Sequence, residues 1–429
     1  MSLFRWQPQS VAALNAGGVI APDQRLPWPQ TAIMGVQHVI AMFGSTVLAP
    51  YLMGFDPNLA IFMSGIGTLI FYFVTGGKVP SYLGSSFGFI GVVIAATGYA
   101  GHGLNANLAV ALGGIIACGA LYALIGLAVQ AAGTGWIERL MPPVVTGSVV
   151  AVIGLNLAAV PIKNMAASTF DSWMQLVTFV CVALVAVFAR GMVQRLLILA
   201  GLLAATAIYL VLTNGLGWGQ PMDFSGIAQA AWLGWPRFTA PVFSAHAALL
   251  IAPVALILVA ENLGHIKAVT AMTGRKLDAY IGRAFIGDGI ATMVSGAAGG
   301  TGVTTYAENI GVMAATRIYS TAVFVAAALI ALLLGFSPKF GALIHAIPLP
   351  VMGGVSIVVF GLIAAAGARI WVVNRVDFAD SANLLTAAIT LVLGTGDFTL
   401  KFGGFALSGI GTATFGAVLL HAVLRRGRG

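Results

Sequence analysis

Long apolar segments separated by short polar loops follow one another from residue 30 to residue 424. A helix needs about 20 mostly apolar residues to cross the hydrocarbon core of a bilayer. Candidate windows lie at 30–50, 57–75, 83–98, 107–130, 142–161, 173–190, 195–214, 246–266, 279–298, 303–315, 318–336, 347–367, 382–397 and 404–424. They predict an all-α polytopic membrane protein with fourteen transmembrane segments. The third and tenth windows are too short for full crossings and are rich in Gly, Ser and Thr.

The low charge content supports lipid as the solvent of this chain. Charged residues make up 7% of it, against roughly 25% in an ordinary soluble domain. No cleavable signal peptide is visible, and residues 1–29 are expected to form a polar cytoplasmic tail. Cys118 and Cys181 each lie in an apolar run and are expected to be buried thiols rather than disulfide or metal ligands.

The positive charges are distributed by topology. If fourteen segments cross the membrane, 16 of the 20 Lys and Arg residues fall on the side of the termini and 4 on the other side. The four are Lys163, Arg237, Lys339 and Lys401. Because cytoplasmic loops carry the excess of Lys and Arg, both termini are predicted to be cytoplasmic. A nucleic-acid-binding protein would instead carry this charge on a soluble domain, and the sequence contains none.

The two short windows resemble each other. Residues 85–89 match 304–308 at an offset of 219, and residues 95–97 match 314–316 at the same offset. Seven segments separate the two windows, so the halves would have opposite topology. Paired short or Gly-interrupted segments in two inverted repeats indicate the binding site of a transporter. Chance similarity between apolar stretches is the alternative.

Three acidic residues lie inside apolar segments, where a charge is costly and therefore indicates function. Glu308 follows the short tenth stretch, and could either contact a solute or cap the following half-helix. Glu261 and His265 are four residues apart and share one helix face, so they are candidates for holding or passing a proton or form a structural polar pair. Asp288 is a candidate for proton coupling, or for helix packing and hydrogen bonding to the tenth segment.

Further candidates lie in the first segment and in the repeat. His38 is a candidate for proton coupling, although a lone His more often makes a structural hydrogen bond, and Ser45 is a candidate substrate-binding hydroxyl. Phe87 and Tyr306 occupy equivalent positions of the repeat. Aromatic rings at such positions could pack against a planar solute, or could simply fill the core.

These groups favour a neutral ring with both N–H and C=O edges, such as uracil. Ionised carboxylates accept hydrogen bonds, whereas an anionic solute would require Arg or Lys in the site, and neither occurs in the core of a predicted segment. A carboxyl group removed from water is easier to protonate, which makes proton coupling plausible. The residues alone leave sugars and amino acids open. No metal-ligand cluster or nucleophile–base motif is visible, so no metal, cofactor or enzymatic activity is expected.

Residues 306–317, Tyr-Ala-Glu-Asn-Ile-Gly-Val-Met-Ala-Ala-Thr-Arg, resemble the signature of the nucleobase–cation symporter-2 family, also called nucleobase–ascorbate transporters. The Asn-x-Gly-x4-Thr-Arg core of that signature is intact. Gln37-His38 and residues 260–265 are similar to motifs of the first and eighth segments in this family. The resemblance covers essentially the whole chain and is closest to bacterial uracil and pyrimidine permeases.

The resemblance implies a fold and a domain organisation. Fourteen segments would form two inverted repeats of seven, with short antiparallel strands in segments 3 and 10 followed by half-helices. Segments 1–4 and 8–11, at 30–130 and 246–336, would form a core domain. Segments 5–7 and 12–14, at 142–214 and 347–424, would form a gate domain that mediates homodimerisation.

The resemblance also implies roles for individual residues. Glu261 and Glu308 would hold the edge of the pyrimidine, the backbone around Ala307 would add contacts, and Phe87 and Tyr306 would line the pocket. His265 is similar to the residue linked to proton coupling. Glu at position 308, where purine and ascorbate members usually have Gln, favours a uracil-type ring. Ala307 stands where related uracil permeases can have Gly, so pocket tightness and exact selectivity stay open.

The sequence therefore predicts a proton-coupled uracil or pyrimidine symporter of the bacterial inner membrane that works by alternating access. Sodium remains open as the coupling ion, and the protein is expected to be embedded in membrane lipid. The alternatives are a purine or xanthine symporter of the same family, an anion transporter of the same fold, a membrane-embedded enzyme and a passive channel.

Overall fold

The computed structural model describes residues 4–10, 18–99, 103–190, 192–402, 405–407 and 409–426. The chain is predominantly helical, as expected where lipid offers the backbone no hydrogen-bonding partner. Cys118 is buried, whereas Cys181 is only partly buried, so the expectation of two buried thiols is wrong for Cys181.

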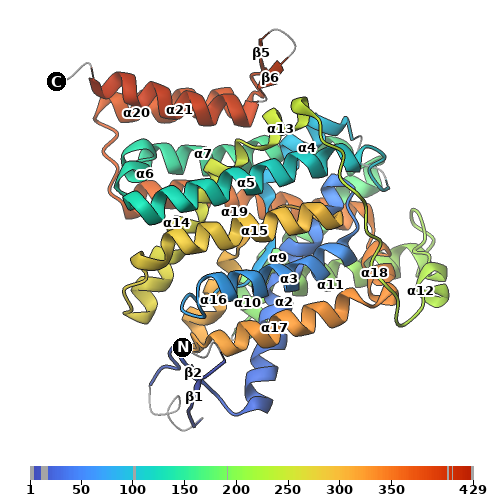
Figure 1. Ribbon diagram of the computed structural model, residues 1–429. Coiled ribbons are helices and arrows are strands. Elements are labelled where there is room, and N and C mark those ends of the chain that lie inside the picture. Colours follow the sequence, from blue (N-terminus) through green and yellow to red (C-terminus); the bar gives the residue numbers. More distant parts are fainter. Residues whose placement is uncertain are drawn as a thin grey trace.

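The elements of the first half begin with a short N-terminal strand pair and continue through segments of very different length (Figure 1). They are β1 (Gln7–Pro8), β2 (Gln24–Arg25), α2 (Trp28–Met53), α3 (Pro57–Val74), β3 (Leu83–Ser85), η1 (Phe87–Phe89), α4 (Ile90–Thr97), α5 (Leu108–Ala132), α6 (Gly135–Leu140), α7 (Pro143–Leu157), α8 (Ala159–Asn164), α9 (Thr169–Phe188), α10 (Met192–Arg195), α11 (Leu197–Leu210) and η2 (Val211–Gly215).

The short helix α12 (Ser225–Gln229) lies in the connection to the second half, which repeats the alternation of long and short elements. Its elements are α13 (Ala245–Ile251), α14 (Val254–Thr273), η3 (Asp278–Tyr280), α15 (Ile281–Ala298), β4 (Val303–Thr305), α16 (Ala307–Thr316), α17 (Thr321–Gly335), α18 (Pro338–His345), α19 (Leu349–Val373), α20 (Ser381–Thr395), β5 (Leu400–Phe402), β6 (Phe405–Leu407) and α21 (Gly409–Arg426).

Each of the fourteen predicted windows contains a helix, but the helices differ in length. Within the described residues, eight are long and apolar enough to cross a membrane, or nine if α17 and α18, bent by 82°, form one span. The helices of the third and tenth windows, α4 and α16, have only 8 and 10 residues. A multi-pass membrane protein follows from these helices, whereas their lengths alone do not give fourteen crossings.

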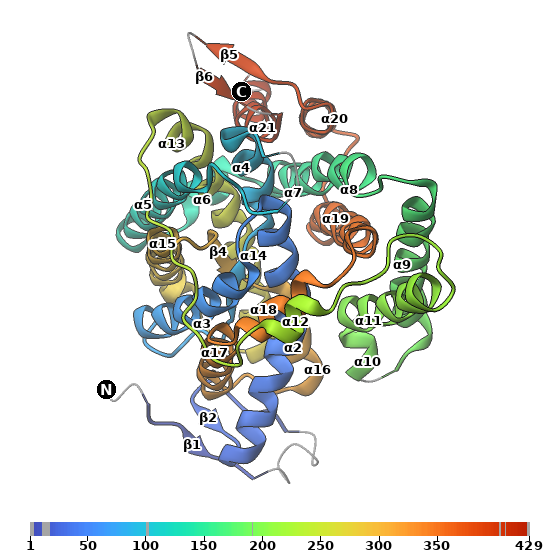
Figure 2. The same cartoon turned by 90° about the vertical axis from the view of Figure 1, so that its right-hand side faces the viewer.

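The helices pack in two groups, which lie side by side in Figure 2. In the first group α5 packs against α15, and α3 and α2 pack against α17. The helices α14 and α16 belong to the same group, since α14 contacts α5 and α15, and α16 contacts α2. In the second group α19 packs against α7 and α9, α7 packs against α20, and α20 packs against α21. The α5–α15 contact is very close, because a Cβ added to Gly119 would lie 2.6 Å from the carbonyl oxygen of Gly289. Small residues permit this approach of two helices in lipid.

Candidate functional site

Two short strands from distant parts of the chain meet in the first helix group. β3 and β4 pair in antiparallel fashion, with Gly84 opposite Thr304. All six residues of the two strands are buried. Each strand is followed by a short helical segment, so two broken segments place their helix N-termini at the same level. Their backbone N–H and C=O groups satisfy one another, which is the condition for irregular backbone inside a membrane.

Tyr306 connects the two broken segments. Its hydroxyl donates a hydrogen bond to the carbonyl oxygen of Ser85 (2.8 Å) and accepts one from the hydroxyl of Thr46 in α2 (3.0 Å). A Cβ at Gly84 would lie 2.6 Å from the Tyr306 ring, so only glycine fits there. Because both hydrogen bonds engage the phenol oxygen, Tyr306 is held rigidly against β3.

A cavity of about 830 Å³ lies between the two helix groups, next to the strand crossing. This volume is in the range of roughly 300–1,000 Å³ that is typical of small-molecule sites. Six of the candidate residues line it, namely Phe87, Glu261, His265, Tyr306, Ala307 and Glu308. The opposite wall is mainly apolar and includes Val150, Ile153, Val359 and Leu362 from α7 and α19.

Glu308 is placed by the first turn of α16, where the positive end of the helix dipole favours a negative group. The hydroxyl of Ser45 in α2 donates a hydrogen bond to Glu308 Oε1. Ser45 is buried and Glu308 is partly exposed to the cavity. The structure therefore brings Ser45 to the site through Glu308, although Ser45 does not itself line the cavity.

Glu261 and His265 line the same cavity from one face of α14. The Nδ1 atom of His265 is hydrogen-bonded to the hydroxyl of Thr305 in β4 at 2.8 Å. This bond ties α14 to the strand that precedes Glu308. The two carboxylates and the imidazole thus belong to elements that are directly linked.

Asp288 and His38 do not line the cavity but lie behind the glutamates. Asp288 Oδ2 accepts a hydrogen bond from the amide of Asn262 (2.7 Å), the residue after Glu261, and one from Tyr122 (3.3 Å). His38 Nδ1 lies 2.9 Å from the amide nitrogen of Asn309, the residue after Glu308. Asp288, His38 and both asparagines are fully buried.

Several site residues escaped the sequence analysis. Arg369 lines the cavity from near the end of α19, so a basic residue faces the site although none lies in the core of a predicted segment. The predicted segment ends at residue 367, whereas the helix continues through the apolar residues 370–373. Asn262 and Asn309 both belong to motifs that resemble the family, but the sequence analysis gave neither asparagine a role of its own. Among the described residues, no three His, Cys, Asp or Glu residues form a group that could hold a metal ion.

Sequence comparisons identify similar proteins along nearly the whole chain. The family described as the permease family matches residues 29–402. RutG of Escherichia coli, which is named as a pyrimidine permease, is 66% identical over 429 residues, covering 99% of this chain and 97% of that protein. The uracil permease of Bacillus caldolyticus is 40% identical over 412 residues, covering 92% of each chain.

Solved structures show the same fold at low sequence identity. The structure of SLC26A9 superposes with a TM-score of 0.66 at 12% identity, covering 93% of this chain and 65% of that chain, so this chain spans less than two thirds of it. The transmembrane domain of the cyanobacterial bicarbonate transporter BicA gives a TM-score of 0.62 at 15% identity, covering 85% and 96%.

Replacing Tyr306 with Phe should destabilise the protein by about 1–3 kcal/mol, because the buried carbonyl of Ser85 would lose its donor. Thermal unfolding of the detergent-solubilised protein measures this. Tyr99→Phe is the matched control, since the Tyr99 hydroxyl donates to Gly103 in an exposed loop. Equal midpoints for both variants would contradict the structural role given to Tyr306.

Proposed function

The chain belongs to the nucleobase–cation symporter-2 family of permeases, and we propose that it imports uracil or a related pyrimidine together with a proton. It is a transporter rather than an enzyme. Transport would proceed by alternating access across the bacterial inner membrane. The observation that carries this proposal is that Glu261 and Glu308 line one cavity beside the crossing of β3 and β4.

The chemistry of the cavity fits a neutral pyrimidine. Ionised Glu261 and Glu308 can accept hydrogen bonds from ring N–H groups. Backbone N–H groups at the start of α16, around Ala307, have no partner in a preceding helical turn and can donate to the ring carbonyls. Phe87 and Tyr306 provide aromatic surface, and because the Tyr306 hydroxyl is already engaged, only its ring is free for the solute. Ser45 contributes by holding Glu308.

The same groups support coupling to a proton. A carboxyl group taken out of water when the cavity closes can be protonated, which removes the cost of a buried charge. We assign this role first to Glu261 and His265, with Asp288 and His38 behind them. Asp288 is hydrogen-bonded to Asn262, the residue after Glu261, and His38 is hydrogen-bonded to Asn309, the residue after Glu308.

The helix contacts support two inverted repeats of seven segments. In two repeats of seven segments, α5 corresponds to α17 and α15 corresponds to α3, and the α5–α15 contact indeed has its counterpart in the α17–α3 contact. In the same way α9 corresponds to α20 and α19 to α7, and the α9–α19 contact has its counterpart in the α20–α7 contact. We propose that the first helix group is the core domain, at 30–130 and 246–336. The second group, at 142–214 and 347–424, would be the gate domain.

The lining of the cavity supports a cytoplasmic opening. Arg369, near the end of α19, and Leu196, at the start of α11, both line it. These positions belong to the side that carries most of the basic residues, which we propose to be cytoplasmic together with both termini. Homodimers would form through the gate domain, whose α20 exposes Leu384, Leu385, Ile389 and Val392.

Reconstituted protein should accumulate radiolabelled uracil in proteoliposomes when a pH gradient, acidic outside, is imposed. Accumulation above the external concentration is expected because proton entry drives the solute inward. A sodium gradient without a pH gradient is the control for the coupling ion. Uptake that only equilibrates uracil across the membrane would identify a channel. Uptake that is the same with and without the pH gradient would exclude the proton as the coupling ion.

Glu308→Gln should weaken uracil binding at least about tenfold, because hydrogen bonds to a charged group contribute roughly 1.5–3 kcal/mol. Equilibrium binding with uracil, thymine, xanthine and uric acid measures both affinity and preference. Glu138→Gln is the control, since Glu138 is an exposed carboxylate paired with Lys267 at 2.7 Å. Unchanged uracil affinity in Glu308→Gln would exclude a role of Glu308 in binding. In the unaltered protein, stronger competition by xanthine than by uracil would favour the purine alternative.

Arg369→Cys should react with a membrane-impermeant maleimide from the cytoplasmic side only. In inside-out vesicles labelling is expected, and saturating uracil should slow it because the solute occupies the same cavity. Leu233→Cys, at a position 79% exposed in the loop after α12, should label from the opposite side. Labelling of both cysteines from one side would contradict the assigned topology.

A further inference from the structure

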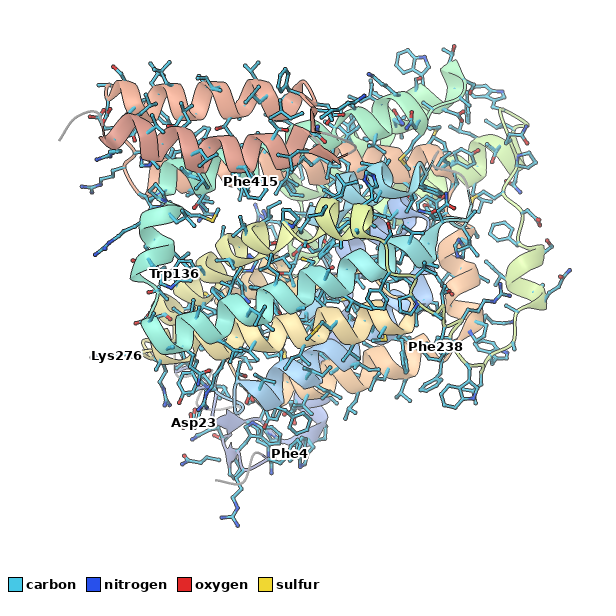
Figure 3. All side chains as sticks on the ribbon, turned by 45° about the horizontal axis from the view of Figure 1, so that its top comes forward. Phe4, Asp23, Trp136, Phe238, Lys276 and Phe415 are labelled. Carbon is cyan, nitrogen blue, oxygen red and sulfur yellow. The ribbon has the colours of Figure 1, made fainter. Side chains whose placement is uncertain are left out.

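The segment before the first long helix is folded against the protein rather than extended from it. β1 and β2 pair in parallel, and Figure 3 shows Phe4 and Asp23 at one end of the molecule. Phe4 contacts Phe73 at the end of α3, with 5.8 Å between ring centroids. Trp6 donates its indole N–H to the Thr321 hydroxyl, the first residue of α17, at 2.9 Å.

The central contact of this segment is Ile20, which is fully buried. Its N–H donates to the carbonyl oxygen of Arg317 (3.0 Å), and its own carbonyl accepts from the N–H of Tyr319 (2.7 Å). Its side chain packs with Leu26, Ile318 and Val323. Ile20 thus adds a strand-like partner to the residues that follow α16.

A second set of hydrogen bonds fixes the same connection. The carbonyl oxygen of Pro22 accepts from both the N–H (3.1 Å) and the hydroxyl (2.9 Å) of Thr321, which is 1% exposed. Arg317, the residue directly after α16, has φ +57°, a left-handed conformation usually taken by glycine. The hydrogen bond from the Ile20 N–H holds the carbonyl group of Arg317 in place and so stabilises this unfavourable backbone conformation.

The position of this connection matters for the site, because α16 has only ten residues. A helix of that length is a rod of about 15 Å, with Glu308 in its first turn and Arg317 just past its last. A shift at the Arg317 end therefore moves the carboxylate at the other end.

We propose that residues 4–10 and 18–27 form a strap that positions α16, with Ile20 as its main positioning residue; this inference rests on the proposed function of Glu308. The strap would set the distance between the carboxylates of Glu308 and Glu261 before the solute arrives. The residues it contacts, on α3, α17 and the connection before α17, belong to the proposed core domain, so the strap moves with the core during transport.

The ion pair of the strap offers a matched control. Asp23 accepts a hydrogen bond from Arg275 at 2.9 Å, but both side chains are about half exposed, 44% and 52%. Exposed pairs of this kind contribute little to stability. Asp23→Asn therefore removes a contact of the strap without releasing the connection after α16, whereas Ile20→Ala removes the buried anchor.

The experiment compares Ile20→Ala, Ile20→Val and Asp23→Asn in the full-length protein. Amide hydrogen exchange without solute should accelerate about tenfold in residues 307–316 of Ile20→Ala only. Uracil affinity of the same variant should fall roughly tenfold, while maximal uptake per folded molecule stays within about twofold because the core–gate movement is untouched. Ile20→Val keeps most of the buried side chain, so its hydrogen exchange in residues 307–316 and its uracil affinity should stay close to those of the unaltered protein.

Unchanged exchange in residues 307–316 would overturn the proposal, and so would faster exchange with unchanged uracil affinity. If Ile20→Ala does not fold, Trp6→Phe replaces it, since this variant keeps an aromatic ring at the position and loses the N–H that donates to Thr321. Absence of uracil binding in the unaltered protein would instead defeat the proposed function. The exchange measurement needs no solute and would still decide whether the strap holds α16.

Discussion

Backbone pairing at the crossing of β3 and β4 is the constraint on which the rest of the structure depends. Two segments that are too short to span a bilayer leave N–H and C=O groups without helical partners at the level of the membrane. Lipid cannot satisfy them, and each unpaired group costs several kcal/mol. The two segments satisfy each other instead, and that solution requires residues 83–85 and 303–305 to meet although more than 200 residues separate them.

This pairing explains where the polar chemistry of the protein lies. Once β3 and β4 are joined, the half-helices that follow them point their N-termini at one cavity. The acidic and imidazole groups come from α14 and α16 of the first helix group, whereas the facing wall from α7 and α19 is mainly apolar. An apolar wall can slide past the polar side chains of the first helix group without breaking hydrogen bonds. This property suits a movement of the two helix groups relative to each other.

Sequence reasoning located the site residues that carry charge or belong to the repeat. Phe87, Glu261, His265, Tyr306, Ala307 and Glu308 all line the cavity, and the roles proposed for them await measurement. It did not separate these residues from Asp288 and His38, because a buried polar side chain in an apolar segment gives the same signal whether it faces a cavity or a neighbouring amide. It also missed Arg369, since a basic residue near the end of an apolar window is equally compatible with a loop.

The sequence by itself determined the solvent, the helical class and the family of this protein, because few charges, long apolar segments and an intact local motif are properties of the chain alone. The tertiary structure decided which polar groups share a cavity, how Tyr306 and Ser45 are engaged, and that the N-terminal residues pack against the end of α16. Those outcomes depend on contacts such as Ile20 with Arg317 and Thr46 with Tyr306. Periodicity and composition carry no information about pairings between residues so far apart in the chain.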